Sequence, residues 1–465
     1  MMQPTGLSWR FGLFLALVGV GLGVQWWAAT QWAGNFGGDE ATVGLVARQI
    51  LAGESTPVYL EGDSGAGTAE VWLAAAVLDS PYQFSSPVLA LRLGNVLLFG
   101  VFVLLHGWLI YKLWGGELAL ISTMLAAVPG AMVLWWTYRP LGAWGMLLVC
   151  GTAALLLSEL NVQDGVVHIG RLLLLGGVMG LGVWSNRLML VYLGVILMLW
   201  LLRTPEWRII YLRVGAQVWP VAGVALLLLG GTALFTAACP TFTTLHTSAQ
   251  IILLASVGWT AVGFGWVSQR NMSLLGQSIA LGVGFAGGNF PQWWAFLANT
   301  EPIPPLLPPV CSTHLGVRAY QLATEVVPHL WGGVWGVAGD GWWWRVGAWA
   351  AVPLMLAAVL YFLWHWRYIW AAVFTLRPLA ADDVKILLPV LLFVLPLALL
   401  WLNGSPLDSL ATRHLLPMWQ GGTVLMAWGV VRLAREWRNW AAVGLLLVVG
   451  YQLLGYIALA NLWSQ

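Results

Sequence analysis

The feature that most limits the fold of this chain is a series of long, uninterrupted apolar runs. A helix needs about 20 apolar residues to cross the hydrocarbon core of a bilayer. Thirteen segments of roughly that length occur along the 465 residues, and their continuous apolar character predicts membrane-spanning helices. The predicted spans are 11–29, 88–111, 118–136, 141–157, 172–186, 187–202, 214–236, 251–267, 274–290, 344–365, 386–402, 414–431 and 440–462.

The composition agrees with a chain that lies mostly in lipid. Hydrophobic residues make up 60% of the sequence and charged residues only 8%, with a net charge of +2. A water-soluble domain has about a quarter charged residues, so soluble and disordered classes are excluded. The small net charge offers no basic face to nucleic acid. We expect one all-α polytopic membrane domain over residues 1–465, without a separate soluble domain.

The distribution of Lys and Arg predicts the orientation. With the N-terminus in the cytoplasm and the C-terminus outside, thirteen of the twenty basic residues fall on the cytoplasmic side. This arrangement in a cytoplasmic (inner) membrane puts two long loops, 30–87 and 291–343, on the outer face. Apolar residues at helical spacing in 41–51 and 68–78 predict amphipathic helices that lie on the membrane within the first loop.

Asp39 and Glu40 directly follow the first predicted span. Two adjacent carboxylates at a water–lipid boundary suit general-base chemistry, in which one takes a proton from an acceptor hydroxyl. The alternative interpretation is that Asp39 only caps a helix that begins at Glu40. The pattern allows both, since a capping geometry would also hold the carboxylate in place.

Three arginines stand at outer helix boundaries: Arg92, Arg139 and Arg413. Guanidinium groups just outside the hydrocarbon suit bidentate capture of a lipid-linked phosphate. The alternative is anchoring to lipid headgroups, which is the usual role of a boundary Arg. Several such residues on the side that holds Asp39 favour the phosphate interpretation more strongly than a single arginine would.

Cysteine and histidine say little about chemistry. Cys239 and Cys311 both fall in outer loops, a placement compatible with a disulfide in an oxidising periplasm. The sequence contains no C-x-x-C or H-E-x-x-H spacing that predicts a metal site. It leaves open whether a divalent cation takes part, and it predicts no cofactor.

Several motifs, taken together in their order, resemble GT-C-fold glycosyltransferases, the group of dolichyl-phosphate-mannose-protein mannosyltransferases and bacterial aminoarabinose transferases. The resemblance spans nearly the whole chain, although each motif alone is weakly specific. The motifs are DEATVGLVARQIL at 39–51, GDSGAGTAEVWLAA at 62–75, SPVLALRL at 86–93, GLGVW at 180–184, GGNFP at 287–291 and RHLLP at 413–417.

This resemblance implies a GT-C-like bundle and a sugar donor linked to polyprenyl phosphate. It implies that Asp39 is the catalytic base with Glu40 beside it, and that Glu70 is the second acidic position of the first outer loop. Arg413, with His414 next to it, would help to hold the lipid phosphate, and Arg139 occupies a comparable place. The implied reaction is an inverting sugar transfer to a glycan, lipid or protein on the outer face.

The sequence departs from the family at three positions. Asp63 and Gly65 stand where Gln and Tyr are common, and His414 replaces a Tyr. Together with the 33 tryptophans, these departures motivate a second hypothesis, a non-catalytic membrane subunit that binds lipid or pigment within a larger complex. A transporter ranks last, because the acids gather at the outer boundary rather than at mid-membrane.

Overall fold

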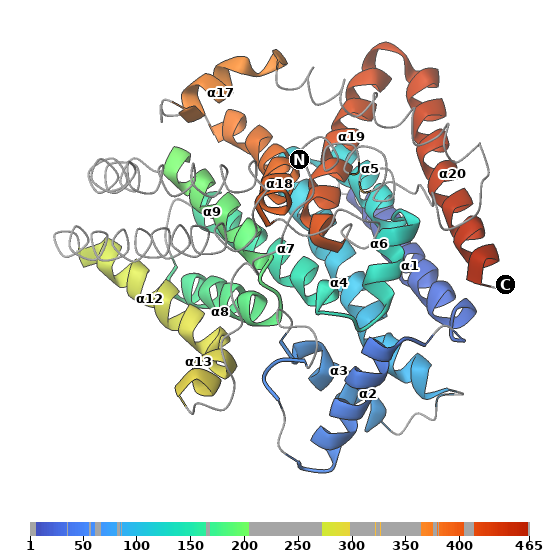
Figure 1. The fold of residues 1–465 in the computed structure, drawn as a ribbon. Coiled ribbons are helices and arrows are strands. Elements are labelled where there is room, and N and C mark those ends of the chain that lie inside the picture. Colours follow the sequence, from blue (N-terminus) through green and yellow to red (C-terminus); the bar gives the residue numbers. More distant parts are fainter. Residues whose placement is uncertain are drawn as a thin grey trace, which may run out of the picture.

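The computed structural model is almost entirely helical in the part of the chain that it describes, which is 6–34, 36–54, 57–60, 67–80, 84, 86–163, 168–203, 272–297, 321, 326, 364–374, 379, 381–403 and 413–463. Within these ranges the only β pairing is an isolated bridge between Tyr59 and Gly67. The helices (Figure 1) are α1 (Gly6–Gln31), α2 (Gly38–Leu51), α3 (Ala69–Leu78), α4 (Pro87–Trp114), α5 (Gly116–Ala127), α6 (Ala131–Tyr138), α7 (Trp144–Gln163), α8 (Ile169–Ser185), α9 (Met189–Arg203), α12 (Met272–Gly288), α13 (Phe290–Leu297), α17 (Arg367–Phe374), α18 (Ala381–Asn403), α19 (Leu416–Glu436) and α20 (Arg438–Trp463).

Four described helices are long and apolar enough to cross a membrane. They contain the segments Trp9–Gln31, Pro87–Trp114, Trp144–Asn161 and Arg438–Ile457. A fifth span results if the bent pair α5 and α6 is taken as one. The described helices α8, α9, α12, α18 and α19, which lie at the predicted spans 172–186, 187–202, 274–290, 386–402 and 414–431, are not among these candidates. The predicted spans 214–236 and 251–267, most of 344–365, and both Cys239 and Cys311 lie outside the described residues. The predicted total of thirteen spans therefore stays a prediction.

The run 118–136, predicted as one straight helix, is broken. Helix α5 ends at Ala127, α6 begins at Ala131, and the two axes differ by 75°. Pro129 explains the break, because proline lacks an N–H group and disfavours the helical conformation in the residue before it. Val128 accordingly has φ −115° and ψ 77°. Every residue of α6 is buried, so this short helix lies inside the protein.

Helices α2 and α3 of the first long loop lie together at one end of the bundle (Figure 1). Their positions agree with the two predicted helices, but the apolar face of α2 packs on protein. Val43, Val46 and Ala47 are buried in a small core, which they form with residues of α3, α4 and the connecting loop: Leu60, Val71, Ala74, Ala75 and Leu91. This side of α2 therefore does not lie on the membrane surface as predicted.

Helix α4 is the central element of the bundle. It packs against α1, α5 and α7 along its length, and against α3 near its beginning. The side chains of Phe99, Phe102 and Ile110 are at most 1% exposed. Because the first turns of α4 also meet the first loop, α4 carries polar residues directly under α2 and α3.

Helices α8 and α12 approach each other at backbone distance through glycines. A Cβ atom added to Gly176 would lie 2.2 Å from the carbonyl oxygen of Leu281, and one added to Gly284 would lie 2.1 Å from that of Leu173. Both helices repeat glycine at a spacing of four, as Gly176 with Gly180 and Gly284 with Gly288. Small residues at this spacing permit close packing of membrane helices.

We predict that Gly284→Ala weakens this contact, whereas Gly282→Ala does not. A Cβ at Gly282 would have no atom within 4 Å. Overpacking a tight contact typically costs about 1–3 kcal/mol, so the apparent melting temperature in detergent should fall for Gly284→Ala alone. Equal melting temperatures of the two variants would contradict the close approach.

Candidate functional site

The first turn of α2 holds the two adjacent acids. Helix α2 begins at Gly38, and its cap is Gly37, whose backbone is extended. The Glu40 carboxylate reaches back and accepts a hydrogen bond from the Gly37 N–H at 3.4 Å. The alternative interpretation, in which Asp39 caps a helix that begins at Glu40, is therefore wrong. Asp39 lies within the first turn and is exposed, while Glu40 is completely buried.

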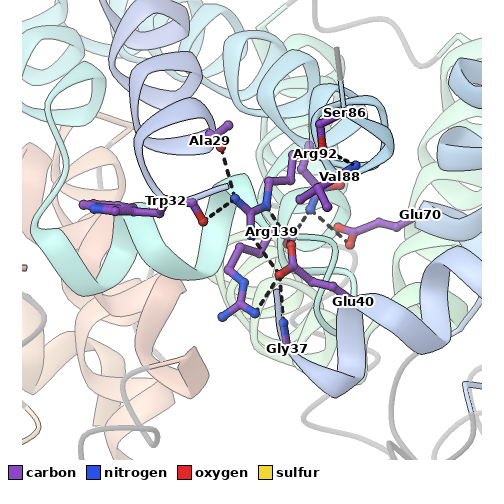
Figure 2. Close-up of polar contacts among 10 residues, drawn as sticks. Ala29, Trp32, Gly37, Glu40, Glu70, Ser86, Val88, Arg92 and Arg139 are labelled. Carbon is purple, nitrogen blue, oxygen red and sulfur yellow. Dashed lines mark hydrogen bonds and ion pairs between the residues drawn. The ribbon is translucent and has the colours of Figure 1, made fainter. Parts of the chain in front are cut away.

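Glu40 forms a bidentate ion pair with Arg92 of α4 (Figure 2). The Arg92 Nε donates to Oε1 at 2.8 Å, and one terminal nitrogen donates to Oε2 at 3.0 Å. The other terminal nitrogen donates to the carbonyls of Ala29 and Trp32 at 3.0 and 2.9 Å. These carbonyls belong to the end of α1, where helical carbonyls lack partners. Arg92 thus joins α1, α2 and α4.

A second arginine, Arg139, reaches the same carboxylate from the connection between α6 and α7 (Figure 2). A terminal nitrogen of Arg139 donates to Glu40 Oε2 at 2.7 Å. Its guanidinium carbon lies 4.2 Å from the ring centroid of Trp135. Its buried Nε has no hydrogen-bond partner in the part of the chain that the structure describes. The three charged side chains in contact therefore have one more positive than negative charge.

Glu40 remains ionised in this environment. Burial by itself would raise its pKa, but hydrogen bonds and positive charge from Arg92 and Arg139 outweigh burial and hold the pKa below its usual value. Glu40 is thus a buried counter-ion for two arginines.

Glu70 lies nearby in the first turn of α3 and binds the beginning of α7. Its Oε1 accepts from the N–H groups of Gly145 and Met146 at 3.1 and 3.3 Å. Its Oε2 accepts from Asn95 Nδ2 at 3.3 Å. Burial raises the pKa of Glu70 to about 7, although these hydrogen bonds lower it. Glu70, although it belongs to α3, therefore caps the N-terminus of α7.

The loop that carries Arg139 is held by two asparagines. Asn95 Nδ2 donates to the carbonyl of Arg139 at 2.7 Å, and Asn186 Nδ2 donates to that of Gly142 at 2.8 Å. Ala143 has φ 59°, a left-handed conformation that costs a residue with a Cβ about 1–2 kcal/mol. The polar contacts around the loop hold this conformation and with it the place of Arg139.

Arg413 and His414 lie in the turn that precedes α19 and contact the aromatic side chains of α6 and α7. The guanidinium carbon of Arg413 is 5.5 Å from the ring centroid of Trp136, and the His414 ring is 5.7 Å from that of Trp144. The Nε2 of His414 accepts a hydrogen bond from Arg413 Nε at 3.4 Å.

The structure brings Glu40, Arg92 and Arg139 into direct contact. Asn95 links this cluster to Glu70, and the neighbouring rings of Trp135 and Trp136 separately hold Arg139 and Arg413. Sequence reasoning missed Asn95, although it stands within a predicted span, one turn after Arg92. A polar residue inside an apolar run is a signal that could have found it.

Within the described ranges, no group of three or more His, Cys, Asp or Glu side chains is arranged to hold a metal ion. The carboxylates of Glu40 and Glu70 accept hydrogen bonds from protein groups. Asp39, which is next to Glu40 in the first turn of α2, is exposed.

Comparisons with known proteins find similar solved structures at low sequence identity. No protein-family profile matches the chain, and no curated protein matches its sequence. It is similar to solved structures of the oligosaccharyltransferase of Archaeoglobus fulgidus. The apo form is 13% identical with a TM-score of 0.48, and the match covers 100% of this chain and 57% of that one.

Two further structures of the archaeal enzyme match in the same way. The form tethered with an acceptor peptide is 12% identical with a TM-score of 0.47, over 99% of this chain and 55% of that one. The complex with an inhibitory peptide and a dolichol-phosphate is 11% identical with a TM-score of 0.44, over 98% and 56%. The chain therefore spans a little over half the length of the oligosaccharyltransferase.

We predict that Glu40→Gln strongly destabilises the protein, whereas Asp39→Asn does not. Removing the charge of Glu40 leaves two arginines facing each other without a counter-ion, and breaking a buried ion pair typically costs about 3–5 kcal/mol. The neighbouring Asp39 is exposed and serves as the matched control. Thermal unfolding in detergent checks this, and a wild-type melting temperature for Glu40→Gln would show that the cluster is not needed for stability.

Glu70 should make stability depend on pH in the direction set by its raised pKa. In the unfolded chain this carboxyl titrates near 4.5 and in the folded protein near 7. Its stabilising contribution is therefore complete below pH 4.5 and is lost as the pH rises to 7.

We expect Glu70→Gln, which cannot ionise, to be free of this loss. The melting temperature of the variant relative to wild type should rise between pH 5 and pH 8 by about 2 °C or more. The other titrating groups are common to both proteins and cancel in the difference. A difference that stays constant over this interval would contradict the raised pKa.

Proposed function

We propose that this chain is an integral membrane glycosyltransferase that takes a sugar from a polyprenyl-phosphate donor. The acceptor is a glycan, lipid or protein on the outer face of the cytoplasmic membrane. The observation that carries the proposal is the contrast between two adjacent acids. Asp39 is exposed, whereas Glu40 is buried between two arginines. The order of the sequence motifs from 39–51 to 413–417 supports the same class.

Asp39 is the proposed base of an inverting transfer. The acceptor oxygen attacks the anomeric carbon, the bond from that carbon to the phosphate oxygen breaks, and the phosphate leaves with the electron pair. The acceptor proton passes to the Asp39 carboxylate. Glu40 does not serve as the base in this proposal, since its oxygens are occupied by Arg92 and Arg139.

The arginines supply positive charge for the departing phosphate. Arg92 is saturated by Glu40 and by the carbonyls at the end of α1. Among the described residues, the buried Nε of Arg139 has no hydrogen-bond partner. Arg413 lies on Trp136 and makes a long hydrogen bond to His414. Fixed guanidinium groups stabilise developing negative charge without reorganising, and such a contact is typically worth a few kcal/mol of barrier.

Asp39→Asn should reduce sugar transfer at least 100-fold and leave the melting temperature unchanged, because the lost carboxylate is exposed and acts only as a base. The matched control is Asp79→Asn, which neutralises another exposed acid of the same loop. Transfer is measured on protein in nanodiscs as release of polyprenyl phosphate from radiolabelled donor lipid. Normal release by Asp39→Asn would remove Asp39 as the base. EDTA in the same assay decides whether a divalent cation takes part.

A non-catalytic membrane subunit is the second candidate function. Glu40 and Glu70 both accept hydrogen bonds from the protein itself, as expected of acids with structural roles. Purification in mild detergent distinguishes the two candidates. Polyprenyl phosphate bound to a single chain supports the enzyme, whereas a stable assembly that contains lipid or pigment but releases no polyprenyl phosphate supports the subunit.

A further inference from the structure

A second polar cluster lies deeper in the bundle, around Gln420 of α19. The Gln420 side chain is 1% exposed. Its Oε1 accepts a hydrogen bond from the Tyr192 hydroxyl of α9 at 2.7 Å. Its Nε2 donates to Thr152 Oγ1 of α7 at 2.9 Å and lies 3.4 Å from His106 Nδ1 of α4. One amide therefore joins α19 to three other helices.

The hydrogen-bonding roles in this cluster are mutually consistent. The two N–H groups of Gln420 match two acceptors, Thr152 Oγ1 and an unprotonated His106 Nδ1. The other ring nitrogen of His106 then donates to Ser122 Oγ of α5 at 2.8 Å. Buried amides are costly unless they are fully bonded, so α19 has one favoured rotation and one favoured depth relative to its neighbours.

Gln420 lies close to the part of the candidate site that precedes α19. Helix α19 begins at Leu416, directly after the turn that holds Arg413 and His414. His414 contacts Trp144 at the beginning of α7, and Gln420 contacts Thr152 further along the same helix. Helices α19 and α7 are therefore joined at two places, and the contact between His414 and Trp144 lies directly beside Arg413.

Apolar contacts alone would hold α19 less specifically. The hydrophobic effect is non-directional, so contacts of side chains such as Leu and Val resist rotation or sliding of a helix only weakly. Hydrogen bonds are directional, and three of them to three different helices define both rotation and depth. A rigid helix passes this restraint to the turn at its beginning.

We propose that Gln420 is a positioning residue that holds Arg413 against Trp136, where the guanidinium meets the phosphate of the lipid-linked donor. This proposal rests on the proposed function. In this proposal Gln420 acts by positioning Arg413 and does not itself contact the substrate.

The test compares two buried glutamines. Gln420→Leu removes all three hydrogen bonds. Gln452→Leu is the matched control, since Gln452 of α20 is also fully buried but its amide atoms have no hydrogen-bond partner among the described residues. Two properties are measured in nanodiscs: the rate at which phenylglyoxal modifies Arg413, followed by mass spectrometry of the peptide, and the kinetics of polyprenyl-phosphate release from the donor lipid.

For Gln420→Leu we expect at least threefold faster modification of Arg413, a KM for the donor about tenfold higher and a lower kcat, because Arg413 both binds the phosphate and stabilises its developing charge. Gln452→Leu should keep wild-type values. Combining Gln420→Leu with Arg413→Ala should give the KM of Arg413→Ala alone, because both changes act on one contact. Independent, additive losses would indicate a merely structural role and overturn the proposal.

Tyr192→Phe and Thr152→Val remove one hydrogen bond each and nearly keep the side-chain shape. They give the answer if Gln420→Leu does not fold, and we expect changes of the same kind of about threefold. If the variants keep the wild-type rate of Arg413 modification or the wild-type donor KM while the wild-type protein does release polyprenyl phosphate, the role of Gln420 is overturned. That result would leave the proposed function intact. A folded wild-type protein without donor turnover would instead overturn the proposed function, and this proposal with it.

Discussion

The carboxylate of Glu40 is the contact on which the rest of the site depends. It binds two arginines that lie 52 and 99 residues away along the chain, and Arg92 in turn binds the carbonyls at the end of α1. A single acidic group thus connects α1, α2, α4 and the loop after α6. Charges buried to this extent are tolerated only when they are paired and hydrogen-bonded, so the segments must come together for any of them to be stable.

The neighbouring positions 39 and 40 have opposite environments because α2 begins where it does. Successive helical residues point about 100° apart, which turns Glu40 toward the arginines and Asp39 toward solvent. The result is a division between an acid that holds the framework and an acid that is accessible. A shift of the sequence by one residue along α2 could put Asp39 in the place of Glu40, and it would then move Glu40 to that of Ala41.

The sequence predicted much of the local structure and part of the site. Apolar spacing located α2 and α3, and the short pair 172–186 and 187–202 is indeed two helices, α8 and α9. Residue type and boundary position single out Glu40, Arg92 and Arg139 in the sequence. The structure brings these three side chains together because charged residues are rare in this chain and buried charges need partners. Their predicted roles toward the acceptor and the lipid phosphate stay predictions.

Other features depend on contacts between distant segments and could not be predicted. The helix start at Gly38 depends on Glu40 reaching back to Gly37. The packing of α2 on protein depends on α3 and Leu91 covering a face that would otherwise suit a lipid surface. Glu70 is identified as a cap for α7 only when the two helices are placed together. The bend between α5 and α6 interrupts a run whose hydropathy is continuous, so its signal was Pro129 alone.

That bend has a consequence for how the protein is made. The hydroxyl of Tyr456 in α20 donates a hydrogen bond to the carbonyl of Pro129. The two residues are separated by 327 positions, so the ribosome synthesises Pro129 long before Tyr456. Until α20 is in place, the carbonyl of Pro129 needs a hydrogen bond from water or from the insertion machinery. The Tyr456 hydroxyl then replaces that donor.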